Sequence, residues 1–307
     1  MYITMSPDYE AQLIDLVETI EVPRVRLHPD TVPDATEALY EVNDKYGPGS
    51  PRPRAHHNAD HGIDHIRRDV QLLNILHPYM KPQHRARCFD LMFRAGAEHD
   101  IILDLGPGAN EIASADIAIK RVEKTDNSLN NKSFKRRLGS IILGTTAEVL
   151  ESGQVIQPKL LTGPRDPLIL ISAYSDIQGI AMEDSARMYG DATSIALERH
   201  NNNPTDEQYV EVLVKQPVMM KENISDRVII PQLEYYFPER SKEVYDELRA
   251  VFRTDMINTY EAAVSLSTRP ELQYAALQVV RALDLGTYKA RSAGKLIGKA
   301  ISTLQRD

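Results

Sequence analysis

Cysteine, tryptophan and long apolar runs are scarce or missing in this chain of 307 residues. The single cysteine, Cys88, excludes an intramolecular disulfide, and its apolar neighbours predict a buried structural thiol. The longest apolar run, residues 168–174, is far shorter than the roughly 18 residues of a membrane span. The N-terminus has no basic segment followed by an apolar one, so we expect no signal peptide and a cytoplasmic location.

Basic residues are the minority among the charged ones. The chain has 36 Lys and Arg against 44 Asp and Glu, which gives a formal charge of −8. Broad nucleic-acid binding relies on an excess of basic side chains against phosphate, so we do not expect it. A small anionic substrate is still compatible with this charge, because a bound cation reverses the field around it.

The apolar residues follow a helical period, which predicts an all-α protein. The segments that show it are 8–20, 59–77, 83–103, 110–124 with Asn110 as N-cap, 134–151, 167–200 and 293–304. The polar run 201–206 marks the expected boundary between a main domain, 1–200, and a helical C-terminal extension, 201–307. The apolar stripe at 293–304 would suit a homodimer interface.

Histidines gather in the segment 55–65, which holds four of the nine in the chain. His57 and His61 are four residues apart, as are His61 and His65, so on a helix each pair would share a face. Neutral imidazole is the commonest protein ligand for transition metals. The segment therefore favours a metal site, and the alternative is a solvated polar face.

Two further polar positions stand in apolar surroundings. His99 and Asp100 follow an apolar helix and precede the run 101–103, and Asp176 follows the apolar run 168–174. Charged groups are costly to bury unless they are paired or bound to metal. These residues are therefore candidate metal ligands.

The order His…His-Asp…Asp resembles the HD superfamily of metal-dependent phosphohydrolases over residues 55–180. This resemblance implies a helical HD domain in which His61, His99, Asp100 and Asp176 bind a divalent cation. It implies one or two ions, of Mn, Fe, Co, Ni, Zn or Mg, with Asp100 able to bridge two of them. The implied activity is hydrolysis of a phosphoester or phosphoanhydride in a small nucleotide-like substrate by a metal-bound water.

Two more specific resemblances add roles. The segment H57-N-x-x-H61 is similar to that of cyclic-nucleotide phosphodiesterases, which implies that His57 is a proton donor and His61 a metal ligand. The pattern HD…NE..SA is similar to small bacterial HD nucleotide hydrolases, which implies that Asn110 and Glu111 face the metal site. Asn110 is then a candidate substrate contact, and Glu111, or alternatively Asp104, is a candidate base. Arg187 and the basic cluster Lys132, Lys135, Arg136 and Arg137 are candidate contacts for outer phosphates.

Two alternatives remain open. An HD-fold di-iron oxygenase would need more histidine ligands between the His-Asp pair and the last Asp, and no His occurs from 101 to 199. A catalytically silent HD scaffold would bind a nucleotide or a partner without turnover.

Overall fold

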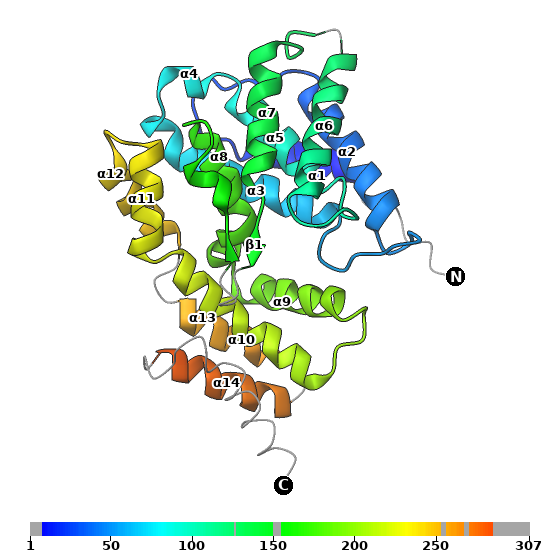
Figure 1. The fold of residues 1–307 in the computed structure, drawn as a ribbon, viewed down its shortest axis with the longest axis vertical. Coiled ribbons are helices and arrows are strands. Elements are labelled where there is room, and N and C mark those ends of the chain that lie inside the picture. The colour runs from blue at the N-terminus through cyan, green and yellow to red at the C-terminus, as the bar shows by residue number, and fades with distance from the viewer. Residues whose placement is uncertain (1–7, 126, 150–154, 253–255, 267–269, 285–307) are drawn as a thin grey trace. The chain divides into compact units, whose positions relative to one another are not determined.

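The computed structural model describes residues 8–125, 127–149, 155–252, 256–266 and 270–284, which form an all-α protein as expected (Figure 1). The α-helices are α1 (Tyr9–Glu18), α2 (Thr31–Tyr46), α3 (Ala59–Leu76), α4 (Pro82–Arg85), α5 (Cys88–Glu98), α6 (Ala109–Lys124), α7 (Lys132–Gly144), α8 (Pro167–Ala173), α9 (Ser185–Arg199), α10 (Asp206–Asn223), α11 (Asp226–Tyr236), α12 (Ser241–Val251), α13 (Met256–Ser265) and α14 (Pro270–Asp284). Shorter helical turns are η1 (His77–Tyr79), η2 (Pro158–Leu161), η3 (Tyr174–Gln178) and η4 (Gly179–Met182). In the described part of the chain, β structure is limited to β1 (Glu148–Val149) paired antiparallel with β2 (Val155–Ile156).

The chain divides into two compact units. The first unit comprises Met1–Ala147, Gln157–Ile177 and Glu234–Arg240, and the second unit comprises Glu148–Ile156, Gln178–Leu233 and Ser241–Asp307. The boundary expected after residue 200 falls inside the second unit, between α9 and α10. The helix expected at 293–304 lies outside the described residues.

Helix α5 is the centre of the first unit. It contacts α2, α3, α6, α7 and α8, and all of its residues are buried. Its buried charges are paired, because Arg94 contacts both Asp34 and Glu98. Such pairing offsets the cost of burying charge and fixes the orientation of this helix, which ends directly before His99.

Two glycines let α3 and α5 approach closely. A Cβ on Gly96 of α5 would lie 2.6 Å from Cγ1 and 3.2 Å from the backbone nitrogen of Ile66 on α3. A Cβ on Gly62 of α3 would lie 2.8 Å from Cδ2 of Leu39 and 3.3 Å from the carbonyl oxygen of Gly96. Larger residues would force the two helices apart.

The helix expected at 83–103 is interrupted. Ala86 is extended and Arg87 has a φ of 56°, so the chain turns between α4 and α5. The helix then ends at Glu98 rather than at 103, which leaves His99 as its C-cap. Cys88, at the start of α5, is buried as predicted, and burial raises the pKa of its thiol to about 11.

The helices expected at 134–151 and 167–200 are also shorter than predicted. Helix α7 ends at Gly144, where a Cβ would lie 2.6 Å from Cγ2 of Ile169 on α8, and β1 follows within the expected helix. Helix α8 gives way to the π-helical turn η3, then η4, and a new helix starts after Asp184. Local N-capping explains this restart, because the Asp184 carboxylate accepts from the backbone N–H groups of Ala186 and Arg187.

In the second unit, α9 packs against α10 and α13, and α14 packs against the same two helices. Buried residues on these helices include Ala192, Val210, Leu213, Val264 and Ala276. None of the helices in the described ranges has the length and apolar character that crossing a membrane requires.

Candidate metal centre

The first two histidines of the site are placed by the start of α3. Asn58 caps this helix, because its Oδ1 accepts from the backbone N–H groups of Asp60 and His61. His61 therefore stands in the first turn and His65 in the next turn on the same face. His57 precedes the cap and lies outside the helix, so the shared helix face applies to His61 and His65 but not to His57 and His61.

The end of α5 supplies the next pair. His99 is the C-cap residue, and its Nδ1 lies 2.9 Å from the carbonyl oxygen of Gly96 in its own helix. Its Nε2 therefore points away from the backbone, towards α3. Asp100 follows immediately, with its side chain 18% exposed, so it lies at the edge of the buried histidines.

Asp176 comes from the π-helical turn η3, which extends α8. Turns of this kind recur at functional sites, because the extra residue redirects the side chains after it. The same segment holds His65, since the Nε2 of His65 lies 3.1 Å from the carbonyl oxygen and 3.2 Å from Oγ of Ser172. Helices α3 and α8 also pack against each other.

These elements bring four side chains into one group that can hold a metal ion. Each of His61, His65, His99 and Asp176 offers a ligand atom, and all four atoms lie within 4.8 Å of one another. Asp176 Oδ1 is 3.7 Å from His61 Nε2 and 3.9 Å from His99 Nε2. We call these four residues the histidine group. Three of them were predicted ligands, and His65 was not.

The fourth predicted ligand, Asp100, adjoins this group. Its Oδ2 lies 3.3 Å from Nε2 of His99 and 3.7 Å from Nε2 of His61. Within the described structure, both Asp100 Oδ2 and His61 Nε2 are buried and lack a hydrogen-bond partner. Two such atoms facing each other indicate a place for a cation, because buried polar atoms normally have partners.

The tautomers of His65 and His99 give the most specific evidence for a cation. A backbone carbonyl only accepts, so Nε2 of His65 and Nδ1 of His99 carry the ring protons. The remaining nitrogens, Nδ1 of His65 and Nε2 of His99, then each present a lone pair, and they face each other at 3.2 Å. Two ligands bound at about 2.0–2.1 Å to one ion lie roughly 2.9–3.4 Å apart, so a shared cation fits this spacing.

The surroundings of His61 and His65 keep both rings in the neutral form that binds metal. Burial, with the neighbouring histidines His56, His99 and His57, holds the pKa of His61 well below its usual value. Burial and the proximity of His99 and Arg68 do the same for His65. Both rings are therefore neutral at pH 7, as metal ligation requires.

Asp176 behaves in the opposite sense. Burial raises the pKa of its carboxyl from 3.8 to about 6, although the nearby His99 opposes the rise. Near neutral pH its carboxylate is ionised at a cost that a cation would relieve. The donor set of three imidazoles and one or two carboxylates is typical of Zn, Fe, Mn, Co or Ni sites.

A buried acid lies behind the group. Asp69 is one turn after His65 on α3 and fully buried, with its Oδ2 3.7 Å from Nε2 of His65. Burial raises the pKa of this carboxyl well above its usual value. At 3.7 Å the Asp69 carboxyl is too far from His65 for a hydrogen bond, so the carbonyl oxygen of Ser172 orients this ring.

Sequence reasoning missed two histidines of this site. His65 was set aside in favour of His61, although both lie on one face of α3. His56 was not selected, yet its ring centroid is 4.6 Å from that of His61, nearer than the 5.5 Å of His57. For His65 the i, i+4 spacing was the available signal, whereas nothing in the sequence indicates the loop conformation that turns His56 inwards.

Asn110 and Glu111 shape the turn after the His-Asp pair. Oδ1 of Asn110 accepts from the backbone N–H of Leu105, and the helix starts at Ala109 after Gly108, so Asn110 is not the N-cap. Oε2 of Glu111 accepts from the backbone N–H of Gly108 at 2.6 Å, which is a capping contact. These are the interactions that the structure shows for the two residues, and contact with substrate stays a prediction.

The remaining predicted residues have other settings. Arg187 is near the start of α9 in the second unit, and its proposed contact with phosphate stays a prediction. Of the basic cluster at the start of α7, Arg137 pairs with Asp166 at 2.6 Å and Lys135 with Glu123 at 2.9 Å. Comparison of the chain with family models, curated proteins and solved structures finds no match.

Proposed function

We propose that this chain is a metal-dependent phosphohydrolase that acts on a small phosphorylated substrate of the nucleotide class. The observation that carries the proposal is the pair of lone-pair nitrogens of His65 and His99, 3.2 Å apart, with carboxylates of Asp100 and Asp176 beside them. The similarity of the His…His-Asp…Asp order to HD phosphohydrolases supports the same chemistry. No match to a known protein contributes to it.

The chain would hold the ion through His61, His65, His99 and Asp176, with Asp100 at the exposed edge. A divalent cation there would supply Lewis acidity to a phosphoryl oxygen and lower the pKa of a bound water. The protein itself fixes the donors, because three of the four are set by helix caps or carbonyl contacts. Such fixed donors reduce the reorganisation needed when the site binds metal or substrate.

A proton donor for the leaving group must come from outside the ligand set. His57 precedes α3 and its ring centroid lies 5.5 Å from that of His61, so it borders the group without entering it. A protonated imidazole can donate its proton to a leaving oxygen. His57 keeps the role of acid in this proposal, and His56 is its alternative because it lies closer to His61.

Basic residues on the neighbouring loop favour an anionic substrate. Arg52 and Arg54 lie on the loop before α3 and pair with Asp104, at 2.7 and 3.7 Å. Asp104 follows Asp100 by four residues, so these guanidinium groups belong to the surface next to the site. If a substrate phosphate replaced Asp104 as the partner of Arg52 and Arg54, both guanidinium groups would bind the substrate.

The test is a turnover screen with metal-stripped protein reconstituted with Mn, Co, Ni, Mg or Zn. The substrates are nucleoside monophosphates and triphosphates, cyclic nucleotides and alarmones, and phosphate or pyrophosphate release is measured. We expect turnover with at least one metal, none before reconstitution, and none for His99→Ala. Absence of turnover for every combination by metal-loaded protein would contradict the proposal and favour a silent binding scaffold.

A second candidate is a di-iron oxygenase. The specific observation in its favour is that His65 and His56 lie beside His61, which gives more imidazoles than the His…His-Asp…Asp order supplies. Two iron ions per chain together with substrate-dependent oxygen consumption would support this candidate over a hydrolase. Turnover with redox-inert Zn or Mg would exclude it.

A further inference from the structure

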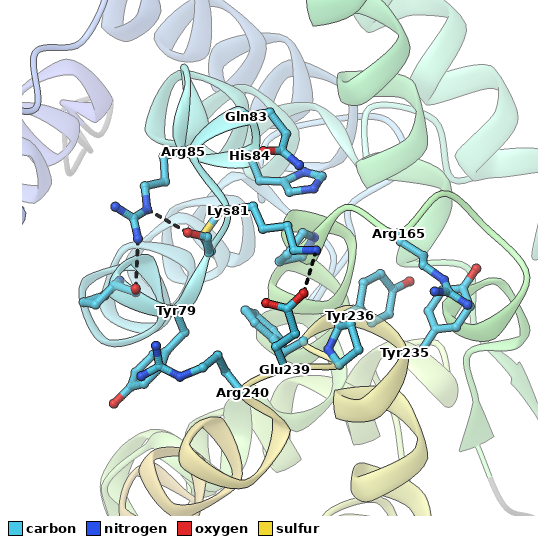
Figure 2. Close-up of a pocket in the computed structure, with 15 residues that line it drawn as sticks. Tyr79, Lys81, Gln83, His84, Arg85, Arg165, Tyr235, Tyr236, Glu239 and Arg240 are labelled. Carbon is cyan, nitrogen blue, oxygen red and sulfur yellow. Dashed lines mark hydrogen bonds and ion pairs between the residues drawn. The ribbon is translucent and has the colours of Figure 1, made fainter.

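The first unit contains a pocket of about 320 Å³ after the end of α3 (Figure 2). Its walls come from the turn 78–85, from residues 165 and 167 before and at the start of α8, and from residues 235–240. A neighbouring pocket of about 370 Å³ shares Gln83, His84 and Arg165 with it. We call the two together the basic pocket. Their volumes are in the range of small-molecule sites.

The basic pocket lies far from the histidine group. His61 stands in the first turn of α3, and the pocket begins just after His77, which is sixteen residues later. At about 1.5 Å per residue, this separation is roughly 24 Å. Helices α5 and α8 likewise begin beside the pocket and lead, at their other ends, to His99 and Asp176.

The lining is strongly basic in a chain that carries a net charge of −8. Six Lys and Arg side chains line the basic pocket against two acidic ones: Lys81, Arg85, Arg136, Arg137, Arg165 and Arg240, with Glu239 and Asp166. Concave sites lined by one sign of charge concentrate counter-ions. The ligand that suits this lining is an anion.

Two of these arginines fix the walls of the pocket. Arg85 donates to the carbonyl oxygens of Met80 and Pro78, at 2.8 and 2.9 Å. Arg137 donates to the carbonyl oxygens of Ala86 and His84, at 2.7 and 2.8 Å. The turn that carries Lys81 is thereby held in place, and a fixed site loses less entropy on binding.

The opposite wall is tied down by tyrosines. The hydroxyl of Tyr235 donates to the carbonyl oxygen of Gly163, and that of Tyr236 to the carbonyl oxygen of Leu160, both at 2.6 Å. Arg165 stacks over the ring of Tyr235, with its Cζ 4.7 Å from the centroid. Arg165 lines both halves of the basic pocket.

Three cations have donors available for a ligand. Arg136 and Arg165 are exposed, and neither makes a hydrogen bond or ion pair within the part of the chain that the structure describes. Lys81 contacts Glu239 at 3.5 Å, with the two side chains 52% and 77% exposed, and such a pair contributes little. In Figure 2, Lys81 and Glu239 lie between the stacked pairs Tyr79–Arg240 and Tyr235–Arg165.

We propose that the basic pocket binds a small anion with two or more linked phosphate groups, at a site separate from the histidine group. Arg165 joins the two halves, so one phosphate would contact Arg136 and Arg165 and the next would contact Lys81. Binding would displace Glu239 from Lys81. The volume admits a diphosphate with an attached nucleoside as well as pyrophosphate alone.

The test is isothermal titration calorimetry on the full chain, stripped of metal with a chelator and then desalted. Inorganic pyrophosphate and adenosine diphosphate are the two probes. We expect one binding event for each, and at least tenfold weaker binding for the double variant Arg136→Gln, Arg165→Gln. Lys120→Gln is the matched control, since Lys120 is exposed on α6 outside the pocket, and it should bind as the unmodified chain does.

A second variant is expected to strengthen binding of the anion rather than weaken it. Glu239→Gln removes the acid that competes for Lys81, so it should tighten binding of both probes by a few-fold. Tighter binding of adenosine diphosphate than of pyrophosphate would identify a nucleoside subsite, and equal binding would identify a phosphate site alone. Unchanged binding in the double variant, or no binding by the unmodified chain, would overturn the proposal.

The His99→Ala variant separates this proposal from the proposed function. It removes a member of the histidine group without touching the basic pocket, so it should bind both probes as the unmodified chain does. Loss of binding in this variant would place the anion at the histidine group and overturn the inference. Failure of the turnover screen would leave this outcome unaffected.

Discussion

Replacement of Asp176 by Asn should stabilise the metal-free protein. Burial raises the pKa of this carboxyl to about 6, and the side chain is only 19% exposed, so solvent screens it weakly. The rise from 3.8 to about 6 corresponds to about 3 kcal/mol of lost stability at pH values above both. Asn has nearly the same shape and no charge, so it removes this destabilisation.

The pH dependence has a definite sign. The folded-state pKa lies above the unfolded value, so between pH 3.8 and about 6 the folded chain holds a proton that the unfolded chain has released. Stability from this group is therefore present at low pH and is lost as the pH rises through about 6. Asp176→Asn should raise the free energy of unfolding by up to about 3 kcal/mol at pH 8, and by about half as much at pH 5.

The assay is urea unfolding of metal-free protein at both pH values, with and without a divalent cation. Asp116→Asn is the control, because Asp116 is exposed on α6 and should show no such gain. A cation at about 100 times its Kd should stabilise the unmodified chain by about 2.7 kcal/mol and leave Asp176→Asn unchanged. The difference between the two proteins in the free energy of unfolding should therefore narrow or change sign when the metal is added.

Two results would contradict this prediction. Lower stability of metal-free Asp176→Asn than of the unmodified chain at pH 8 would mean that the carboxylate is already well paired. Equal stabilisation of both proteins by the cation would mean that Asp176 is not a ligand.

Further expectations concern the ligands and the helix packing. His99→Ala should lose bound metal, measured by elemental analysis, while its helical circular dichroism stays unchanged. His57→Ala should keep the metal and lower turnover by about 10²- to 10⁴-fold, the usual contribution of a general acid; loss of metal would show that His57 is a ligand. Metal affinity, followed by calorimetry, should fall as the pH drops below about 6, because Asp176 must release its proton to bind. Gly96→Ala should destabilise the chain by about 1–3 kcal/mol in urea, because its Cβ would lie 2.6 Å from Cγ1 of Ile66, whereas Gly190→Ala has open space and should not.

The helical spacing of apolar residues predicted the fold class, and the order of the polar residues predicted most of the candidate site. The spacing of apolar residues predicted α1 and α3 to within two residues at each end, because each has one buried face and a clear start. His99 and Asp176 were found because each stands beside an apolar segment, and His61 was found through the cluster of histidines in 55–65 and the HNxxH similarity. Their convergence in space could not be read from spacing, since it depends on the packing of α3, α5 and α8.

The predicted helices 83–103 and 167–200 were wrong in extent, and each break has a local physical cause. Arg87 adopts a left-handed conformation that separates α4 from α5, and residues 83–90 contain no Gly or Pro that would indicate a break. The π-helical turn at 174–178 follows a segment whose apolar pattern continues unchanged. The role of Glu111 stays a prediction, because the contact that the structure shows for it is the cap that a Glu at the third position of a helix makes.

Anomalous diffraction from crystals of the full chain loaded with Zn or Mn would locate the bound ion itself. We expect a peak within about 2.0–2.3 Å of Nδ1 of His65 and Nε2 of His99, with His61 and Asp176 also bound. Those two nitrogens would keep roughly their 3.2 Å spacing. Absence of a peak at this position, or a peak bound by other residues with His65 and His99 uninvolved, would contradict the proposed metal site.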